Sequence, residues 1–144
     1  MEIRTRMCMS ADGCVTTPDG WPVQLADPAF APGESYGFPK FQESSSHTPE
    51  GTPEEVVVES DPEVLLEQVR AANRGGDVHL VGGPRTIETV RALGALDKLG
   101  LIVLPLLTGE GMRLTPSLST DARLTLESQR ALATGAVEIV YDCA

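Results

Sequence analysis

The feature that most constrains the fold is a regular alternation of strand-like and helix-like segments after residue 53. The β-branched run EEVVVES, residues 54–60, precedes a helical segment, and the short strand DVHLV, residues 77–81, precedes another. The next run, KLGLIVLPLL at 98–107, is apolar on both faces, which is typical of a central strand covered on both sides. This order predicts parallel strands joined by right-handed helical crossovers.

The residues at the helix starts support the two helices, and the C-terminal tail predicts an antiparallel edge of the sheet. Each helix opens with a proline, and Asp61 or Ser60 is placed to cap the first of them. The tail RLTLESQRALATGAVEIVYD, residues 123–142, predicts two alternating strands in an antiparallel hairpin. We therefore expect an α/β sandwich whose mixed sheet is parallel in the middle and antiparallel at one edge. The apolar face predicted for the first helix comprises Val64, Leu65, Val69 and Ala72.

The first half of the chain is less regular. A strand over Glu2–Met9 runs into a loop with two Asp-Gly turns, and this loop holds the single tryptophan, Trp21. A short helix is predicted after Pro32, with Tyr36, Phe38 and Phe41 on it. Residues 44–53, inside the stretch ESSSHTPEGTPE, have the composition of a linker.

Composition excludes several classes of partner. The 144 residues suit one domain, and a formal charge of -10 disfavours binding to nucleic acid or to anionic membranes. No run of about 18 apolar residues and no signal peptide is visible, so a cytoplasmic location is expected. Three cysteines without metal-ligand spacing predict reduced thiols and no metal site.

The strongest chemical signal is the turn from Gly82 to Thr86. Glycines at the end of a strand let a phosphate approach the backbone, and the following helix start attracts anions. Arg85 and Thr86 would add a charge and a hydroxyl. The alternative is a tight turn that needs glycine for its backbone angles and binds nothing.

Three segments together resemble the dihydrofolate reductase-like family, which includes the reductase domain of riboflavin biosynthesis. They are MSADGCVTTPDGW, the stretch from DVHLVGGPRTIETV to LPLLTGEGMRL, and LTLESQRALATGAVEIVYD. The resemblance implies a three-layer sandwich, NADPH-dependent reduction of a small molecule, and a homodimer. It further implies that Gly82, Gly83, Arg85 and Thr86 contact the cofactor pyrophosphate, and that Asp12–Trp21, with Thr16, forms a mobile loop over nicotinamide and substrate.

Each remaining candidate has two interpretations. Asp12 is either an acid/base group or simply a turn residue, and Trp21 is either a lid over a planar ligand or an anchor to the core. The resemblance places Glu34, Tyr36 and Phe38 beside the substrate cleft, with Tyr36 a catalytic candidate; a solvent-facing Glu34 and a core tyrosine are the alternatives. His79 is expected to be a core or interface residue.

One departure from the family pattern bears on function. The family has a strand, a helix that starts with G-R-x-T and a further strand at the place where this sequence has only ESSSHTPEGTPE. The chain therefore lacks this phosphate-binding helix start and about 30 residues around it. Two or three lost charge-assisted bonds, at about 1.5 to 3 kcal/mol each, would weaken dinucleotide binding by about a thousandfold.

Three functions remain open. The first is an enzyme that has lost its cofactor and performs cyclisation, isomerisation or dehydration in specialised metabolism. The second is a surviving NADPH-dependent reductase of a pteridine-, pyrimidine- or enone-like molecule. The third is a non-catalytic ligand-binding subunit.

Overall fold

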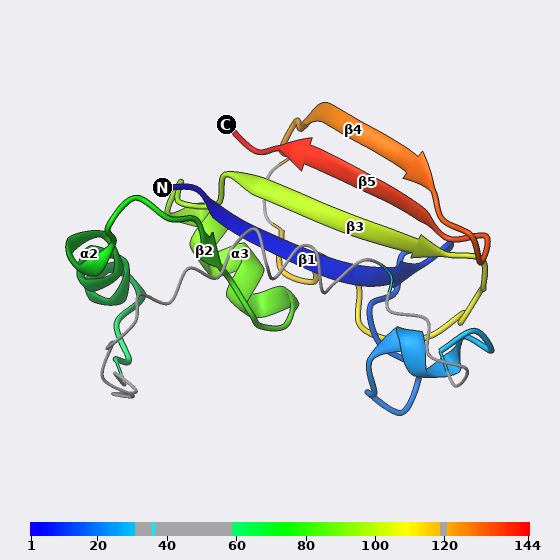
Figure 1. The fold of residues 1–144 in the computed structure, drawn as a ribbon. Coiled ribbons are helices and arrows are strands. Elements are labelled where there is room, and N and C mark those ends of the chain that lie inside the picture. Colours follow the sequence, from blue (N-terminus) through cyan, green and yellow to red (C-terminus); the bar gives the residue numbers. More distant parts are fainter. Residues whose placement is uncertain (31–35, 37–58, 119–120) are drawn as a thin grey trace.

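A computed structural model describes residues 1–30, 36, 59–118 and 121–144 (Figure 1). Within these residues the helices and strands follow one another in the order expected from the sequence. They are β1 (Ile3–Ser10), the 3-10 helix η1 (Val23–Ala26), α2 (Pro62–Ala72), β2 (Val78–His79), α3 (Pro84–Ala92), β3 (Lys98–Leu104), β4 (Thr125–Ala131) and β5 (Val137–Asp142).

The described strands form a mixed sheet in the order β2-β1-β3-β5-β4. Strands β2 and β3 both pair with β1 in parallel, while β5 is antiparallel to β3 and β4 to β5. Strand β3 is central, and Ile102 and Leu104 on it are completely buried. The predicted α/β fold, with a parallel centre and a C-terminal antiparallel hairpin, is therefore confirmed.

Helix α2 begins as predicted. Asp61 is its N-cap, and the Asp61 carboxylate accepts hydrogen bonds from the backbone N–H groups of Glu63 and Val64. Pro62 occupies the first turn, where its missing N–H costs no intrahelical bond. Helix α3 also opens with a proline, Pro84, but its N-cap is Gly83 and no side chain caps it.

Two apolar clusters pack on the sheet. One joins α2 and α3 to β1 through the buried residues Leu66, Ile87, Val90 and Ile3. The other lies near the carboxyl ends of β1 and β3, where Cys8, Val23, Tyr36, Ile102, Leu104 and Ala136 are buried. The sheet is thus held by helices along β1 and β2 and by the first loop at its carboxyl end (Figure 1).

The structure corrects the predicted apolar face of α2. Leu66 is the buried residue of this helix, whereas Val64, Leu65 and Ala72 are exposed. The helix is rotated relative to the expected face because only Leu66 reaches the cluster with α3 and β1. The expected strand at 54–60, the linker and the helix after Pro32 lie almost wholly outside the described residues.

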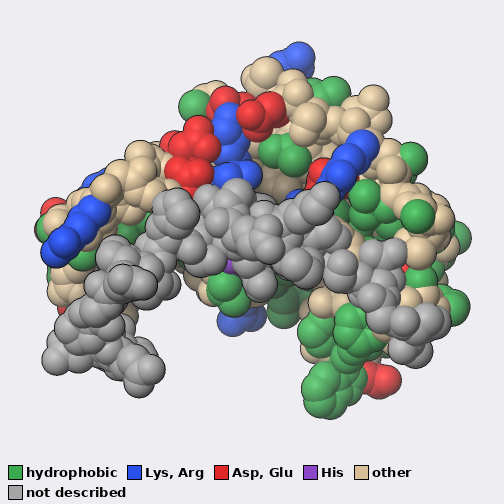
Figure 2. Space-filling view, in the orientation of Figure 1, with side chains coloured by type: hydrophobic (Ala, Val, Ile, Leu, Met, Phe, Trp, Pro, Cys, Tyr) green, Lys and Arg blue, Asp and Glu red, His purple; other side chains and the backbone are tan. Residues whose placement is uncertain are grey.

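Charged side chains gather on one part of the molecular surface (Figure 2). Lys98 on β3 lies 3.3 Å from a carboxylate oxygen of Glu127 and 3.1 Å from one of Asp142, and Arg4 lies 3.2 Å from Asp77. These partly exposed pairs contribute little stability individually. In the described part of the chain, no helix is long and apolar enough to cross a membrane.

Burial of β3 predicts a large effect of mutation at its centre. We expect Ile102→Ala to lower the free energy of unfolding by about 2 to 5 kcal/mol, because the side chain is fully buried in the cluster near the carboxyl ends of β1 and β3. Leu25→Ala, at a side chain of η1 that is 49% exposed, is the control and should change it by less than about 0.5 kcal/mol. Urea unfolding measures both, and equal effects would contradict the described core.

Candidate active site

The Asp12 carboxylate joins the loop after β1 to the loop after β3. It accepts hydrogen bonds from Ser10 Oγ at 2.5 Å, from the Gly109 N–H at 2.7 Å and from the Thr108 N–H at 3.2 Å. These bonds lower the pKa of Asp12 to about 2, with the Ser10 hydroxyl contributing most. A carboxylate so acidic and so fully engaged is a poor acid or base at neutral pH. The contacts favour a structural role over the predicted acid/base role.

Further bonds complete this clamp between the two loops. The Met112 N–H donates to Thr16 Oγ1 at 2.7 Å, and the Val15 N–H donates to the Met112 carbonyl at 2.8 Å. Gly111 has φ +140°, and a Cβ there would lie 2.3 Å from the Thr16 carbonyl oxygen. Gly111 is therefore needed for the close approach of the two loops.

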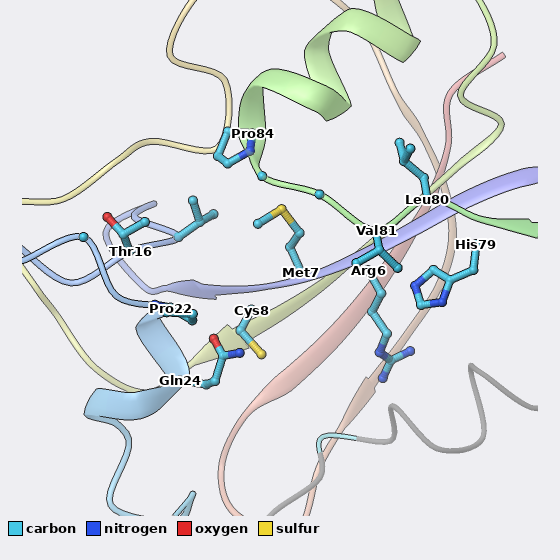
Figure 3. Close-up of a pocket in the computed structure, with 14 residues that line it drawn as sticks. Arg6, Met7, Cys8, Thr16, Pro22, Gln24, His79, Leu80, Val81 and Pro84 are labelled. Atoms are coloured by element: carbon cyan, nitrogen blue, oxygen red, sulfur yellow. The ribbon is translucent and has the colours of Figure 1, made fainter. Parts of the chain in front are cut away.

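A cavity of about 450 Å³ lies at the carboxyl end of the parallel strands (Figure 3). Its walls come from β1, from the first loop and η1, and from the chain between β2 and α3. Ligands of open α/β sheets commonly bind at this edge. The lining residues are Arg6, Met7, Cys8, Val15, Thr16, Gly20, Pro22, Gln24, His79, Leu80, Val81, Gly82, Gly83 and Pro84.

Arg6 is held in the cavity wall by a buried ion pair. It contacts Glu138 on β5 and donates to the Tyr36 carbonyl at 2.5 Å, while Glu138 also accepts from Arg130 Nε at 2.6 Å. Burial would raise the pKa of Glu138, but the hydrogen bonds and charges of Arg130 and Arg6 more than offset this and lower it. The pairing holds the Arg6 guanidinium in the cavity wall, and the negative charge of Glu138 is shared between Arg6 and Arg130.

The other titratable groups of the cavity are His79 and Cys8. Burial, and then the charge of Arg4, lower the pKa of His79, so its ring is neutral at neutral pH. Burial raises the pKa of the Cys8 thiol to about 12, which keeps it protonated and unreactive. No carboxylate is among the described residues that line the cavity. Within the described ranges, no three His, Cys, Asp or Glu side chains are grouped so that they could hold a metal ion.

The structure divides the four predicted phosphate-binding residues. Gly82 and Gly83 line the cavity, whereas the exposed Arg85 and Thr86 face a second groove on the other side of the turn. A Cβ at Gly82 would lie 2.8 Å from the Thr86 Cβ, so packing alone explains this glycine. A Cβ at Gly83 would meet nothing within 4 Å, which leaves the backbone open to a ligand.

The remaining predicted site residues are not brought together. Tyr36 is buried and its hydroxyl donates to Asp27 Oδ2 at 2.8 Å, which favours the core alternative over catalysis. Trp21 is 65% exposed and does not line the cavity, so it does not anchor the loop in the core. Glu34 and Phe38 lie outside the described residues, while Thr16 lines the cavity, and its predicted contact with a ligand stays a prediction.

Sequence reasoning missed Arg6 and Gln24 and placed His79 in the core or at an interface. His79 is half-buried and faces the cavity (Figure 3). The signal was its position three residues before the glycine turn, at the end of a parallel strand. Arg6 gave no such signal, because its pairing with Glu138 joins residues 132 positions apart in the sequence.

Comparison with known proteins gives one family and one fold. Residues 35–137 match the sequence model of the RibD C-terminal domain. The uncharacterized protein YyaP of Bacillus subtilis strain 168 is 34% identical over 79 residues, which are 54% of this chain and 42% of that protein. The match thus spans less than half of that relative's length.

Solved structures with low sequence identity share the fold. A putative riboflavin biosynthesis protein from Shewanella sp. PV-4 superposes with a TM-score of 0.76 at 15% identity, covering 100% of this chain and 99% of the other. A pyrimidine reductase-like protein from Corynebacterium diphtheriae gives 0.63 at 15% identity, with 99% and 92% covered. RibD from Acinetobacter baumannii gives 0.69 at 10% identity, with 99% of this chain and 58% of RibD covered.

The clamp predicts a specific effect of removing the Asp12 charge. In Asp12→Asn, amide hydrogen exchange of Thr108 and Gly109 should accelerate by about tenfold or more, because charge-assisted bonds are weakened. Asp19→Asn, in an exposed turn of the same loop, is the control and should leave the exchange rates of these two amides unchanged.

The low pKa also predicts how the clamp responds to acid. The pKa of Asp12 in the folded protein, about 2, lies below the ordinary value of 3.8, so the stabilisation is present above pH 3.8 and is lost as pH falls through about 2. Protection of the Gly109 amide should be constant between about pH 7 and 4. A loss of protection near pH 6 would contradict the assigned contacts.

Proposed function

The chain belongs to the RibD C-terminal domain family, and on this basis we propose that it reduces a small organic molecule with a nicotinamide dinucleotide. The observation that carries the proposal is the cavity between the first loop and the Gly82–Gly83 turn, open at Gly83. Its volume of about 450 Å³ suits a small planar ligand. The resemblance favours NADPH as the dinucleotide.

The residues present fit the nicotinamide half of such a cofactor. Met7, Leu80 and Val81 supply apolar wall for a flat ring, and the open backbone at Gly83 admits the ribose and the first phosphate. When bound, the cofactor supplies a hydride to the substrate. The chain's own contribution is to orient both molecules and to exclude water between the clamped loop and the turn.

The polar groups of the cavity suit recognition better than carboxylate chemistry. Arg6 and Gln24 can bind polar substituents of a substrate, and neutral His79 can donate one ring proton while its other ring nitrogen accepts. With Asp12 engaged in the clamp, the described wall holds no carboxylate for proton transfer. This favours reduction over the cofactor-independent reactions.

A second candidate function follows from the missing G-R-x-T segment. If the dinucleotide is no longer held, the same cavity would serve cyclisation, isomerisation or dehydration in specialised metabolism, with His79 as its neutral acid/base group. Binding of a substrate without turnover would instead indicate a non-catalytic ligand-binding subunit. Reduced cofactor added to the purified protein separates these cases.

We also propose a cytoplasmic homodimer that pairs through the edge strand β4. All seven residues of β4 are exposed, and Leu126 on it is 55% exposed. An exposed edge of this length is normally covered, and a two-fold dimer covers it symmetrically. The free thiols of Cys8, Cys14 and Cys143 suit a reducing compartment.

The central prediction concerns Gly83. Wild-type protein should bind NADPH with a dissociation constant above about 10 μM, because the second phosphate grip is missing. Gly83→Val should weaken binding by about tenfold or more, since the new side chain would enter the cavity, while its extended backbone accepts any residue.

Fluorescence titration measures the binding, and thermal unfolding checks that Gly83→Val folds. Ala71→Val, at an exposed position of α2 away from the cavity, is the matched control and should bind like wild type. If Gly83→Val binds NADPH with unchanged affinity, the cavity is not the cofactor site. Absence of any binding of NADPH would favour the cofactor-independent candidate.

The dimer has its own test. Sedimentation should give a dimer for the wild type and a monomer for Leu126→Lys, because a charge on the β4 edge opposes strand pairing. Leu25→Lys, on the exposed side of η1, is the control and should remain dimeric. A wild-type monomer at micromolar concentration, or a Leu126→Lys dimer, would contradict this interface.

A further inference from the structure

Arg6 on β1 reaches its carboxylate partner, Glu138 on β5, across an intervening strand. Strand β3 lies between β1 and β5 in the sheet. The residue of β3 that pairs with Arg6 is Gly100, where an added Cβ would lie 3.5 Å from Arg6 Cγ. Because Gly100 has no side chain, the path over β3 stays open and the guanidinium contacts Glu138.

The cavity has a polar side and an apolar side. Side chains alternate between the two faces of a strand, so Arg6 and Met7 of β1 point to opposite sides of the sheet (Figure 3). His79 and Gln24 lie on the side of Arg6, and Pro84 lies on the side of Met7 (Figure 3). The polar group of a substrate therefore finds its hydrogen-bonding partners on the side of Arg6.

The positive charge on this side is matched by Glu138. Among the described residues that line the cavity, Arg6 is the one cation at neutral pH and none is a carboxylate. The side chains of Arg6 and Glu138 are only 6% and 11% exposed. The pKa of Glu138 is lowered by its arginine partners, so it is ionised at neutral pH and offsets the charge of Arg6.

Arg130, the second partner of Glu138, does not upset this balance at the cavity. Its side chain is 56% exposed, so water and salt screen its charge far more than that of the buried Arg6. An anionic ligand in the cavity would lose its hydration and would meet Arg6 together with the repulsive charge of Glu138.

We propose that Glu138 determines substrate specificity by restricting the cavity to uncharged carbonyl compounds, an inference that rests on the proposed function. A carbonyl oxygen accepts hydrogen bonds from the Gln24 amide or from neutral His79 and brings no charge into the cavity. A carboxylate or a phosphate in the same place is disfavoured. Glu138 acts through Arg6 and is not itself among the residues that line the cavity.

Two flat probes of the same shape and different charge test the proposal. They are cinnamamide, which is uncharged, and cinnamate, which carries a carboxylate. Amide NMR of isotope-labelled protein gives both dissociation constants from the shifts of Thr16 and Gln24. We expect the wild type to bind cinnamamide about tenfold or more tightly than cinnamate, and Glu138→Gln to change this ratio by about tenfold in favour of cinnamate, because Arg6 is then unmatched.

Two further variants separate the charge of Glu138 from its packing. Arg130→Gln removes the exposed partner of Glu138, keeps the pair with Arg6 and should not strengthen the binding of cinnamate. The double variant Arg6→Gln/Glu138→Gln removes both charges and should bind cinnamate within about twofold of the wild type, which would show that Glu138 acts through Arg6. Thermal unfolding checks that each variant folds.

The wild-type ratio alone tests the proposal if Glu138→Gln does not fold. Equal or tighter binding of cinnamate by the wild type overturns it, as does the absence of shifts with either probe at millimolar concentration. A Glu138→Gln variant that folds and keeps the wild-type ratio overturns it as well.

The outcomes also separate this inference from the proposed function. If the chain binds NADPH but does not prefer cinnamamide, the reductase proposal stands and the role of Glu138 fails. If the chain prefers cinnamamide, loses this preference in Glu138→Gln and does not bind NADPH, the role of Glu138 stands and the reductase proposal fails.

Discussion

The site depends on one carboxylate that ties together the ends of two neighbouring parallel strands. Asp12 follows β1, and the N–H groups that it binds belong to Thr108 and Gly109 after β3. Loops at the end of a sheet are ordinarily its most mobile parts. Here the clamp gives the first loop a defined course over the carboxyl edge of the sheet. The cavity keeps its shape because this loop is one of its walls.

The other wall follows from the shortness of β2. This strand pairs with β1 through only two residues, Val78 and His79, and the chain then leaves β1 toward Gly82. The divergence opens the space between Met7 on β1 and the glycine turn. A longer β2 would have filled the cavity with paired backbone. The cavity thus results from the early end of β2, and α3 begins at Pro84 in the cavity wall.

The sequence predicted the elements well, because their signals are local. The apolar run of β3, the prolines opening α2 and α3 and the alternation of the C-terminal hairpin each depend on residues close in the chain. The site was predicted less completely, because its contacts join residues that lie far apart in the sequence. The engagement of Asp12 by residues about 97 positions away could not be read from the Asp-Gly turn. The rotation of α2 toward Leu66 likewise depends on where α3 and β1 lie.

The most direct test of the account is amide NMR of isotope-labelled protein during titration with reduced nicotinamide mononucleotide. The account predicts that the largest chemical-shift changes fall on Thr16, Gly82 and Gly83, the two walls of the cavity. Changes confined to other surfaces, or no saturable change at these three amides, would contradict the claim that the clamped loop and the glycine turn form the binding site.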